Sequence, residues 1–426
     1  MPTPRAAKPL RLLLVTLLAI GFANCVVADP ITDLAREAET NPAAVRAVRD
    51  RGPTGLASVR RVYADRTDEP AVRGLIEAVA AQKDAHAAWL YWHTDLDHAL
   101  ERARQEGKPV LSLRLLGRLD TDLSCANSRF FRSLLYPDPE VNHRLAERFV
   151  LHWQSVRPVP VVTVDFGDGR TLRRSVVGNS VHLAIDRRGR VIDAMPGLVN
   201  AQVFAAWLDA VADNEPALPA TDARAALATW HAARRDAIHL QVALATSQPG
   251  VTTPPGGTGG RNAEAADRLA PSKSIISRPM LRALGEAELA RVLEQDGEAW
   301  PALAHGYAES SKLSQPARDL IRAKHPAEST HGPAASEPAA ADALLAVFAG
   351  LERSIARDTA RSELGLHRRL HGWYADREVD PADIDGLVRR IYDELFLAPI
   401  DDPWHGLTPD DAYAALDDGG RMISHP

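Results

Sequence analysis

The stretch Leu123-Ser-Cys-Ala-Asn-Ser-Arg-Phe130 most constrains the fold of this chain, because it places a cysteine between a buried strand and a helix. The strand is Pro109-Val-Leu-Ser-Leu-Arg-Leu115, and a loop leads from it to Cys125. The helix runs from Cys125 to Leu135 and is ended by Pro137. A helix N-terminus directs unsatisfied N–H groups at such a thiol, which lowers its pKa. The middle of the chain is therefore expected to be organised around this junction.

Residues 89–213 are predicted to form one α/β domain with a mixed sheet flanked by helices. Apolar spacing and turn residues mark its elements. They are a helix over Asp95–Glu106, the strand over 109–115, the cysteine helix, a second helical run to Glu147, a strand over Phe149–Trp153, a hairpin over 161–177, a second hairpin over 181–194 and a helix over Gln202–Val211. The tryptophans Trp89, Trp92, Trp153 and Trp207 are expected to be core residues, with Trp92 and His93 covering a sheet edge.

Several motifs in this domain resemble those of the exported thioredoxin-like family. They are Gly107-Lys-Pro-Val-Leu, Cys125 opening a helix, Arg148-Phe-Val, and Ile185-Asp-Arg-Arg-Gly-Arg-Val191 ahead of Pro196-Gly. The resemblance implies a thioredoxin-like fold and a monothiol active site, Cys-Ala-Asn-Ser. In that site Cys125 is the nucleophile, Ser128 donates a hydrogen bond to the thiolate and Arg129 supplies positive charge.

The chain departs from the family pattern in three places. Ser128 stands where the family's second cysteine would be, so the dithiol cycle is not available. The family's cis-proline is replaced by Gly178-Asn179-Ser180, and the loop from Leu115 to Cys125 is longer than usual. The alternatives for Cys125 are a buried, unreactive residue in a non-catalytic domain and a ligand to a metal or cofactor.

Residues 1–28 have the pattern of a signal peptide, with Arg5, Lys8 and Arg11 ahead of the apolar run Leu12–Ala23. Cleavage after Ala28 changes the formal charge from −6 to −9 and removes Cys25, which leaves Cys125 as the sole cysteine. The expected location is the periplasm or the extracellular space. An uncleaved membrane anchor is the alternative, since the apolar run is at the short end of a spanning helix.

The other regions are predicted to be mostly α-helical. They are a helical N-terminal region over 29–88, a helix over 214–245, a flexible linker over 246–272 and a helical C-terminal region over 273–426. In the last of these, Glu363, His367 and His371 are spaced by four, so one helix face could present them to a metal ion. Because Arg368 and Arg369 lie between the histidines and no zincin motif is present, a solvated surface helix is the favoured interpretation.

These patterns predict an exported thioredoxin-like protein that acts as a monothiol (Cys-x-x-Ser) redox protein of the cell envelope. The alternative is a non-catalytic thioredoxin-like binding or scaffold module with a helical interaction domain. A metal-dependent activity of the helical half ranks third. The expected partners are protein thiols or a small thiol joined through a mixed disulfide; no cofactor and no nucleic acid is expected, and membrane contact only through an uncleaved signal segment.

Overall fold

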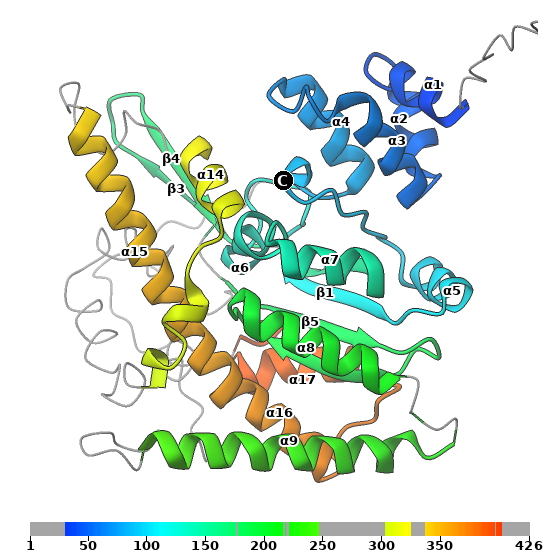
Figure 1. Ribbon diagram of the computed structural model, residues 1–426, viewed down its shortest axis with the longest axis vertical. Helices are drawn as coiled ribbons and strands as arrows, with labels where there is room; N and C mark the ends of the chain where they lie inside the picture. Colours follow the sequence, from blue (N-terminus) through cyan, green and yellow to red (C-terminus); the bar gives the residue numbers. More distant parts are fainter. Residues whose placement is uncertain are drawn as a thin grey trace, which may run out of the picture.

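The structure is a computed structural model that describes residues 30–175, 178–215, 218, 221–246, 303–324, 337–396 and 398–402. The predicted signal peptide and Cys25 lie outside these residues, and so do residues 247–272 of the predicted linker and the acidic end of the chain. Where it is described, the chain is a mixed α/β protein with a four-stranded sheet and many helices (Figure 1).

The N-terminal region folds into four short helices, each of which begins at a proline. Proline is favourable at the first helical position, because the N–H it lacks would have no partner there. The helices α1, α2, α3 and α4 cover Pro30–Glu37, Pro42–Arg49, Pro53–Tyr63 and Pro70–Ala80. They enclose a hydrophobic cluster of their own and stand as a separate group in Figure 1.

The main sheet has the strand order β2-β1-β5-β6. Strand β1 pairs parallel with β2 and antiparallel with β5, and β5 pairs antiparallel with β6. Every residue of β1, β5 and β6 is buried, so helices cover both faces of the sheet. The strands β1, β2, β5 and β6 cover Val110–Leu116, Val150–Arg157, Ser180–Ile185 and Val191–Pro196.

The first predicted hairpin forms a separate two-stranded sheet that extends away from the main one (Figure 1). Its strands β3 and β4 cover Val161–Asp165 and Thr171–Ser175. Gly167 and Gly169 turn the chain with φ values of 76° and 90°, a region that glycine enters without strain. In β3 the side chains alternate between half-buried and exposed, as expected for a ribbon with little core beneath it.

The predicted helices of the α/β domain are present with shifted ends. After α4 a short 3₁₀ turn η1 precedes α5, which Asp95 caps at its start and Gly107 ends with a φ of 69°. The cysteine helix consists of α6 and a π-helical turn, η2, and α7 and α8 pack against each other. The bounds are η1 Ala85–Ala87, α5 Leu96–Glu106, α6 Ala126–Phe130, η2 Phe131–Leu135, α7 Pro139–Arg148 and α8 Ala201–Asn214.

The sheet edge next to β2 is covered as predicted. His93 donates its backbone N–H to Leu151 O at 2.8 Å and accepts one from Trp153 N at 3.1 Å. Beside it, the buried indole of Trp92 donates to Gln82 Oε1 at 2.7 Å. Three of the four predicted core tryptophans are buried in the main core, whereas Trp89 is half-buried against the N-terminal helices.

The C-terminal helices complete the core of the sheet. Leu370, Tyr392 and Leu395 are fully buried in the same hydrophobic cluster as β1 and β5. The outer edge of β6 is covered as well, because Val191 donates its N–H to Pro381 O at 2.7 Å. The bounds are α9 Ala223–Thr246, η4 Glu309–Ser311, α14 Gln315–Lys324, α15 Glu337–Arg361, η5 Ser362–His367, α16 Arg368–Ala375, α17 Ile384–Arg390 and η6 Ile391–Leu395.

A buried ion pair joins three parts of the chain. Arg132 on η2 donates to Asp84 Oδ2 at 3.0 Å, and the Lys324 ammonium on α14 lies 2.6 Å from the same oxygen. Both Asp84 and Arg132 are buried, whereas Lys324 is partly exposed. The pair fixes the N-terminal helices and α14 against the cysteine helix.

Candidate functional sites: a buried thiol and a buried histidine cluster

Cys125 lies where the sequence predicts it, at the N-cap of the helix that follows β1. Its backbone N–H donates to Leu116 O at 3.2 Å, which ties the cap to the end of the strand. The N–H of Ser128 donates to the sulfur at 3.4 Å, so the thiol performs the capping role that a serine or aspartate oxygen usually performs. The side chain has an exposed fraction of 0%.

The hydroxyl of Ser128 is arranged differently from the predicted thiolate donor. It donates to the carbonyl oxygen of Cys125 at 2.9 Å, and it accepts from the Cys125 thiol at 3.4 Å. A hydroxyl has only one proton. In this arrangement the hydroxyl therefore interacts with the neutral S–H, and the hydrogen bond that would favour a thiolate comes from the backbone.

Arg129 lies one turn into the same helix and is half-buried. Burial lowers the pKa of its guanidinium, and the negative charge of a thiolate at Cys125 acts in the opposite direction. Its Nε and Nη2 atoms are buried without a hydrogen-bond partner among the described residues. Arg129 is thus close enough to Cys125 to interact electrostatically.

The segment Gly178-Asn179-Ser180 faces the first turn of α6. A Cβ atom added to Gly178 would lie 2.8 Å from the Cβ of Ala126 and 3.2 Å from Oδ1 of Asn127. This is the place where the family pattern has a cis-proline, and the described residues contain no cis peptide bond. The close approach explains why the smallest residue stands at position 178.

A C-terminal side chain covers this region. Tyr392 is fully buried and donates its hydroxyl to Asn179 O at 3.1 Å. Burial raises the pKa of the Tyr392 phenol well above its usual value, and charge on Cys125 adds to the rise. Tyr136, on the other side, has its pKa raised well above the usual value by the same two causes. Two phenols therefore lie near the thiol, one of them from a helix about 270 residues further along the chain.

The histidines of the C-terminal helices are buried, so the interpretation of a solvated surface helix is wrong for them. His367 and His371 each have an exposed fraction of 1%. The reason is that η5 packs on β6, and α16 packs along α9, which covers the histidine face. The four-residue spacing of these side chains predicts that they share one helix face, but it does not predict which elements cover that face.

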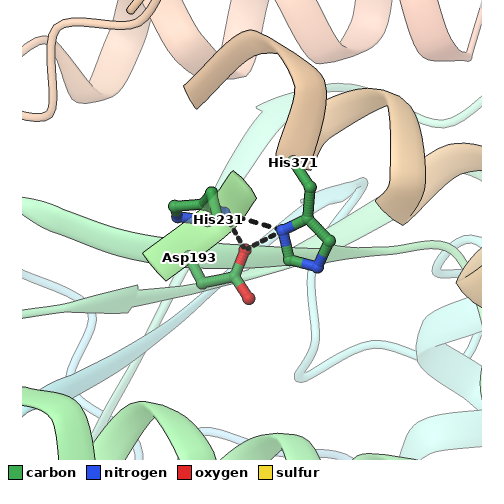
Figure 2. Close-up of side chains that lie close together, drawn as sticks. All are labelled: Asp193, His231 and His371. Atoms are coloured by element: carbon green, nitrogen blue, oxygen red, sulfur yellow. Dashed lines mark hydrogen bonds and ion pairs between the residues drawn. The ribbon is translucent and has the colours of Figure 1, made fainter. Parts of the chain in front are cut away.

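The predicted trio of Glu363, His367 and His371 does not converge on one point. The two ring nitrogens of His367 contact different carboxylates. Nδ1 lies 3.1 Å from Glu363 Oε2, and Nε2 lies 3.0 Å from Asp193 Oδ2. His371 instead directs Nδ1 at His231 Nδ1, 2.7 Å away (Figure 2). The residues that the sequence analysis missed are therefore Asp193 on β6 and His231 on α9.

Both missed residues carry a signal in the sequence. Asp193 interrupts the apolar strand Val191–Pro196, where a buried carboxylate needs partners. His231 lies four residues after Leu227, and both are fully buried on one face of α9. A polar residue on the apolar stripe of a helix indicates a buried polar contact, although it does not identify the contacting residue.

Asp193 is the centre of this cluster. Its Oδ2 accepts from the Trp207 indole at 3.0 Å and from His367 Nε2 at 3.0 Å. Burial alone would raise the pKa of Asp193, but the charge of His367 and the hydrogen bond from it hold that pKa well below its usual value. Burial alone would lower the pKa of His367, but Asp193 and Glu363 raise it to about 10. These two residues therefore form a buried carboxylate–imidazolium pair.

The other two histidines are neutral. Burial lowers the pKa of His231 to about 4 and that of His371 well below its usual value. His231 Nε2 lies 2.9 Å from Ile192 O, so the ring donates from Nε2 and its Nδ1 lone pair points at His371. The Tyr374 ring stacks on His231 with centroids 4.0 Å apart and fixes its plane.

One carboxylate oxygen and two imidazole nitrogens converge in Figure 2. Asp193 Oδ1 lies 3.9 Å from His231 Nδ1 and 4.0 Å from His371 Nδ1. Two imidazoles and a carboxylate are a ligand set of zinc proteins. Among the described residues, these three side chains could hold a metal ion.

A pocket of about 210 Å³ lies elsewhere, between α3, α5 and α7. Aromatic and charged side chains line it together, among them Arg60, Trp89, Tyr91, Arg102 and Lys108. The predicted site residues do not line this pocket. In the part of the chain that the structure describes, no helix has both the length and the apolar character needed to cross a membrane.

Comparisons of the chain with models of protein families, with curated proteins and with solved structures found no match.

Proposed function

We propose that this chain is an exported protein built on a thioredoxin-like domain that serves as a non-catalytic binding or scaffold module. The thioredoxin-like assignment is supported by the order β2-β1-β5-β6, which joins a parallel pair to an antiparallel pair. Cys125 at the N-cap of the helix between β1 and β2 supports it as well. Export rests on the sequence pattern of residues 1–28.

The observation that carries the non-catalytic function is the complete burial of Cys125. A nucleophilic thiol must meet its target sulfur or oxygen, so reactive cysteines are partly exposed. Here the sulfur has an exposed fraction of 0%, and its proton is directed at Ser128. The C-terminal Tyr392 binds the loop that faces the helix start. The site of a redox thiol is thus used for packing.

The helical half supplies the interaction surface in this proposal. Leu240 and Leu244 lie one turn apart on α9 and are exposed by 62% and 63%. Exposed leucines on one helix face are typical of surfaces that bind other proteins. The side of α9 that carries His231 is buried, so the helix packs one face on the core and exposes Leu240 and Leu244 on another.

Thiol alkylation under native conditions tests the proposal. In a Cys25→Ser chain Cys125 is the only thiol, and we expect it to react with a maleimide only after the protein is denatured. Native labelling at the rate of a free thiol, with a midpoint well below pH 8, would overturn the non-catalytic assignment. Denatured protein labelled in parallel shows that the reagent is active.

A monothiol redox function is the second candidate, and it is favoured by the hydrogen bond from the Ser128 N–H to the sulfur. In this function the Cys125 thiolate attacks a disulfide, forms a new S–S bond and displaces a thiolate that takes up a proton. Its partners would be protein thiols or a small thiol. It requires that the C-terminal helices move away from Cys125.

Two substitutions at one position separate the two candidates. Tyr392→Ala removes the ring, whereas Tyr392→Phe removes only the hydrogen bond to Asn179. If Tyr392 covers a reactive thiol, the alanine variant is labelled rapidly, with a midpoint below pH 8, and forms a mixed disulfide with an added disulfide reagent. If Cys125 is only a packing residue, neither variant forms the mixed disulfide while it remains folded.

A further inference from the structure

We infer that Asp193, His231 and His371 form a structural zinc site that ties α9 and α16 to strand β6. The inference does not depend on the proposed thioredoxin-like function. It rests on the convergence of three ligand atoms from three separate elements, with exposed fractions of 0–1%.

The ligand atoms are prepared for a metal ion. Metal-bound histidines usually donate their second ring N–H to a carbonyl or carboxylate, which fixes the ring and raises the basicity of the ligating nitrogen. His231 meets this condition through Ile192 O at 2.9 Å, and its Nδ1 is left with a lone pair. The other oxygen of Asp193, Oδ2, is held by Trp207 and His367. Oδ1 accepts from the Ala194 N–H at 2.8 Å and from His367 Nε2 at 3.2 Å, and it lies 3.9 and 4.0 Å from the two Nδ1 atoms.

The distances fit one ion after a small adjustment. Zinc binds nitrogen and oxygen at about 2.0–2.2 Å, so two ligand atoms of a tetrahedral site lie about 3.3 Å apart. The three separations here are 2.7 Å between the two Nδ1 atoms and 3.9 and 4.0 Å from these to Oδ1. A shift of each side chain by under about 1 Å makes the triangle regular.

The residue types also suit a divalent cation. Two imidazoles and one carboxylate supply the nitrogen and oxygen atoms that zinc binds, and a water molecule would complete a four-coordinate site. His367 is not among the three converging ligands and instead binds the carboxylate of Asp193, with Nε2 3.0 Å from Oδ2.

The competing interpretation is a hydrogen bond in which His371 Nδ1–H donates to His231 Nδ1. It uses the same 2.7 Å contact, and in it Oδ1 of Asp193 keeps the hydrogen bonds that it accepts from the Ala194 N–H at 2.8 Å and from His367 Nε2 at 3.2 Å. The two interpretations differ in one respect that can be measured, because only the metal site makes the stability of the folded chain depend on zinc.

Metal titration of the full chain is the first test. Protein treated with EDTA and then desalted is titrated with Zn²⁺, and with Co²⁺ as a coloured substitute. We expect one tight equivalent and the visible absorption of a four-coordinate cobalt site. Changes to residues that only orient the ligands weaken metal binding by about 10–100-fold, so loss of a ligand in His231→Gln or His371→Gln is expected to weaken it by at least about 100-fold.

His239→Gln is the matched control, because His239 is exposed on the same helix α9 and the substitution is the same. It is expected to leave zinc binding unchanged. Equal zinc affinity in the wild type, His231→Gln and His239→Gln would overturn the inference, as would a failure of the wild type to bind.

Thermal unfolding of the wild type needs no variant and covers the case in which the glutamine variants do not fold. If zinc is structural, EDTA lowers the midpoint of the wild type and added Zn²⁺ restores it, whereas folded His371→Gln protein does not respond to either. If the wild type melts at one temperature with EDTA and with Zn²⁺, the histidines form only a hydrogen-bonded network and the inference is wrong.

Discussion

The Nδ1 atoms of His231 and His371 lie 2.7 Å apart although 140 residues separate them in the chain. One ring belongs to α9, which directly follows the α/β domain, and the other belongs to α16 near the end of the described chain. A contact this short between two neutral, buried imidazoles requires a shared proton or a shared cation. It therefore fixes how the C-terminal helices lie against the sheet.

The tautomer of His231 is predicted to be the Nε2–H form from pH 5.5 upward. Its pKa is lowered to about 4, and Ile192 O accepts from Nε2. Nitrogen-15 spectra of histidine-labelled protein, with His231→Gln to assign the signals, measure this directly. A protonated Nδ1 on His231 at pH 7 would show that the assignment of donor and acceptor is reversed.

The stability of the fold is predicted to fall as the pH drops below 6.5. Burial lowers the pKa of His182 to about 3, and burial with the nearby charge of Arg114 lowers that of His152 to about 3. Because the unfolded chain binds these protons near pH 6.5 and the folded chain does not, their contribution is complete above pH 6.5 and is lost toward pH 3. Relative to pH 7, each of these two histidines lowers the free energy of unfolding at pH 5 by about 2 kcal/mol.

Urea unfolding of His182→Gln and wild type at pH 7 and pH 5 measures this loss. The variant is expected to lose about 2 kcal/mol less than the wild type between the two pH values. His98→Gln, at an exposed position, serves as the control and should follow the wild type. An equal loss in all three proteins would contradict the prediction.

Asp84→Asn is predicted to lower the free energy of unfolding by about 3–5 kcal/mol, because it leaves the buried Arg132 guanidinium without its carboxylate. Lys324→Met removes the partly exposed partner and should cost about 1 kcal/mol or less. Chemical denaturation of both variants checks the ratio. Equal losses would mean that Lys324 and not Arg132 is the main partner of Asp84.

Gly178→Ala is predicted to destabilise the fold by about 1–3 kcal/mol. The added methyl group would lie 2.8 Å from Ala126 Cβ, so the loop or the start of α6 must shift. Gly350→Ala is the opposite case, because the new Cβ in α15 meets nothing within 4 Å and alanine favours a helix by up to about 1 kcal/mol. Shifts of the same sign in the two thermal midpoints would contradict this pair of predictions.

Local signals predicted most of the elements. Asp95 and Gly107 at the ends of α5 and the glycines in the β3–β4 turn each act over a few residues. The position of the thiol could also be predicted from local sequence, since a buried strand, a loop and a helix start follow one another directly. The cover that Tyr392 provides over this region could not be predicted in this way, because Tyr392 comes from a helix far along the chain.

The histidine cluster depends on contacts between distant segments, which local sequence signals do not predict. The spacing of His367 and His371 gave a shared helix face, but whether that face meets solvent depends on α9 and β6. Asp193 and His231 are single polar residues in apolar segments, and one sequence does not pair them across the fold. The two arginines between the histidines favoured a surface position, although Arg368 is itself half-buried.

The position of Leu370, Tyr392 and Leu395 in the core of the sheet affects how the protein is made. Strand β6 ends at Pro196, and the helix that covers the thiol ends about 200 residues later. At a synthesis rate of about 5–20 residues per second, the completed sheet waits roughly 10–40 s for the segment that covers it. During that interval the apolar residues of the sheet lack the cover of Leu370, Tyr392 and Leu395, so the nascent chain exposes apolar surface that the finished protein buries.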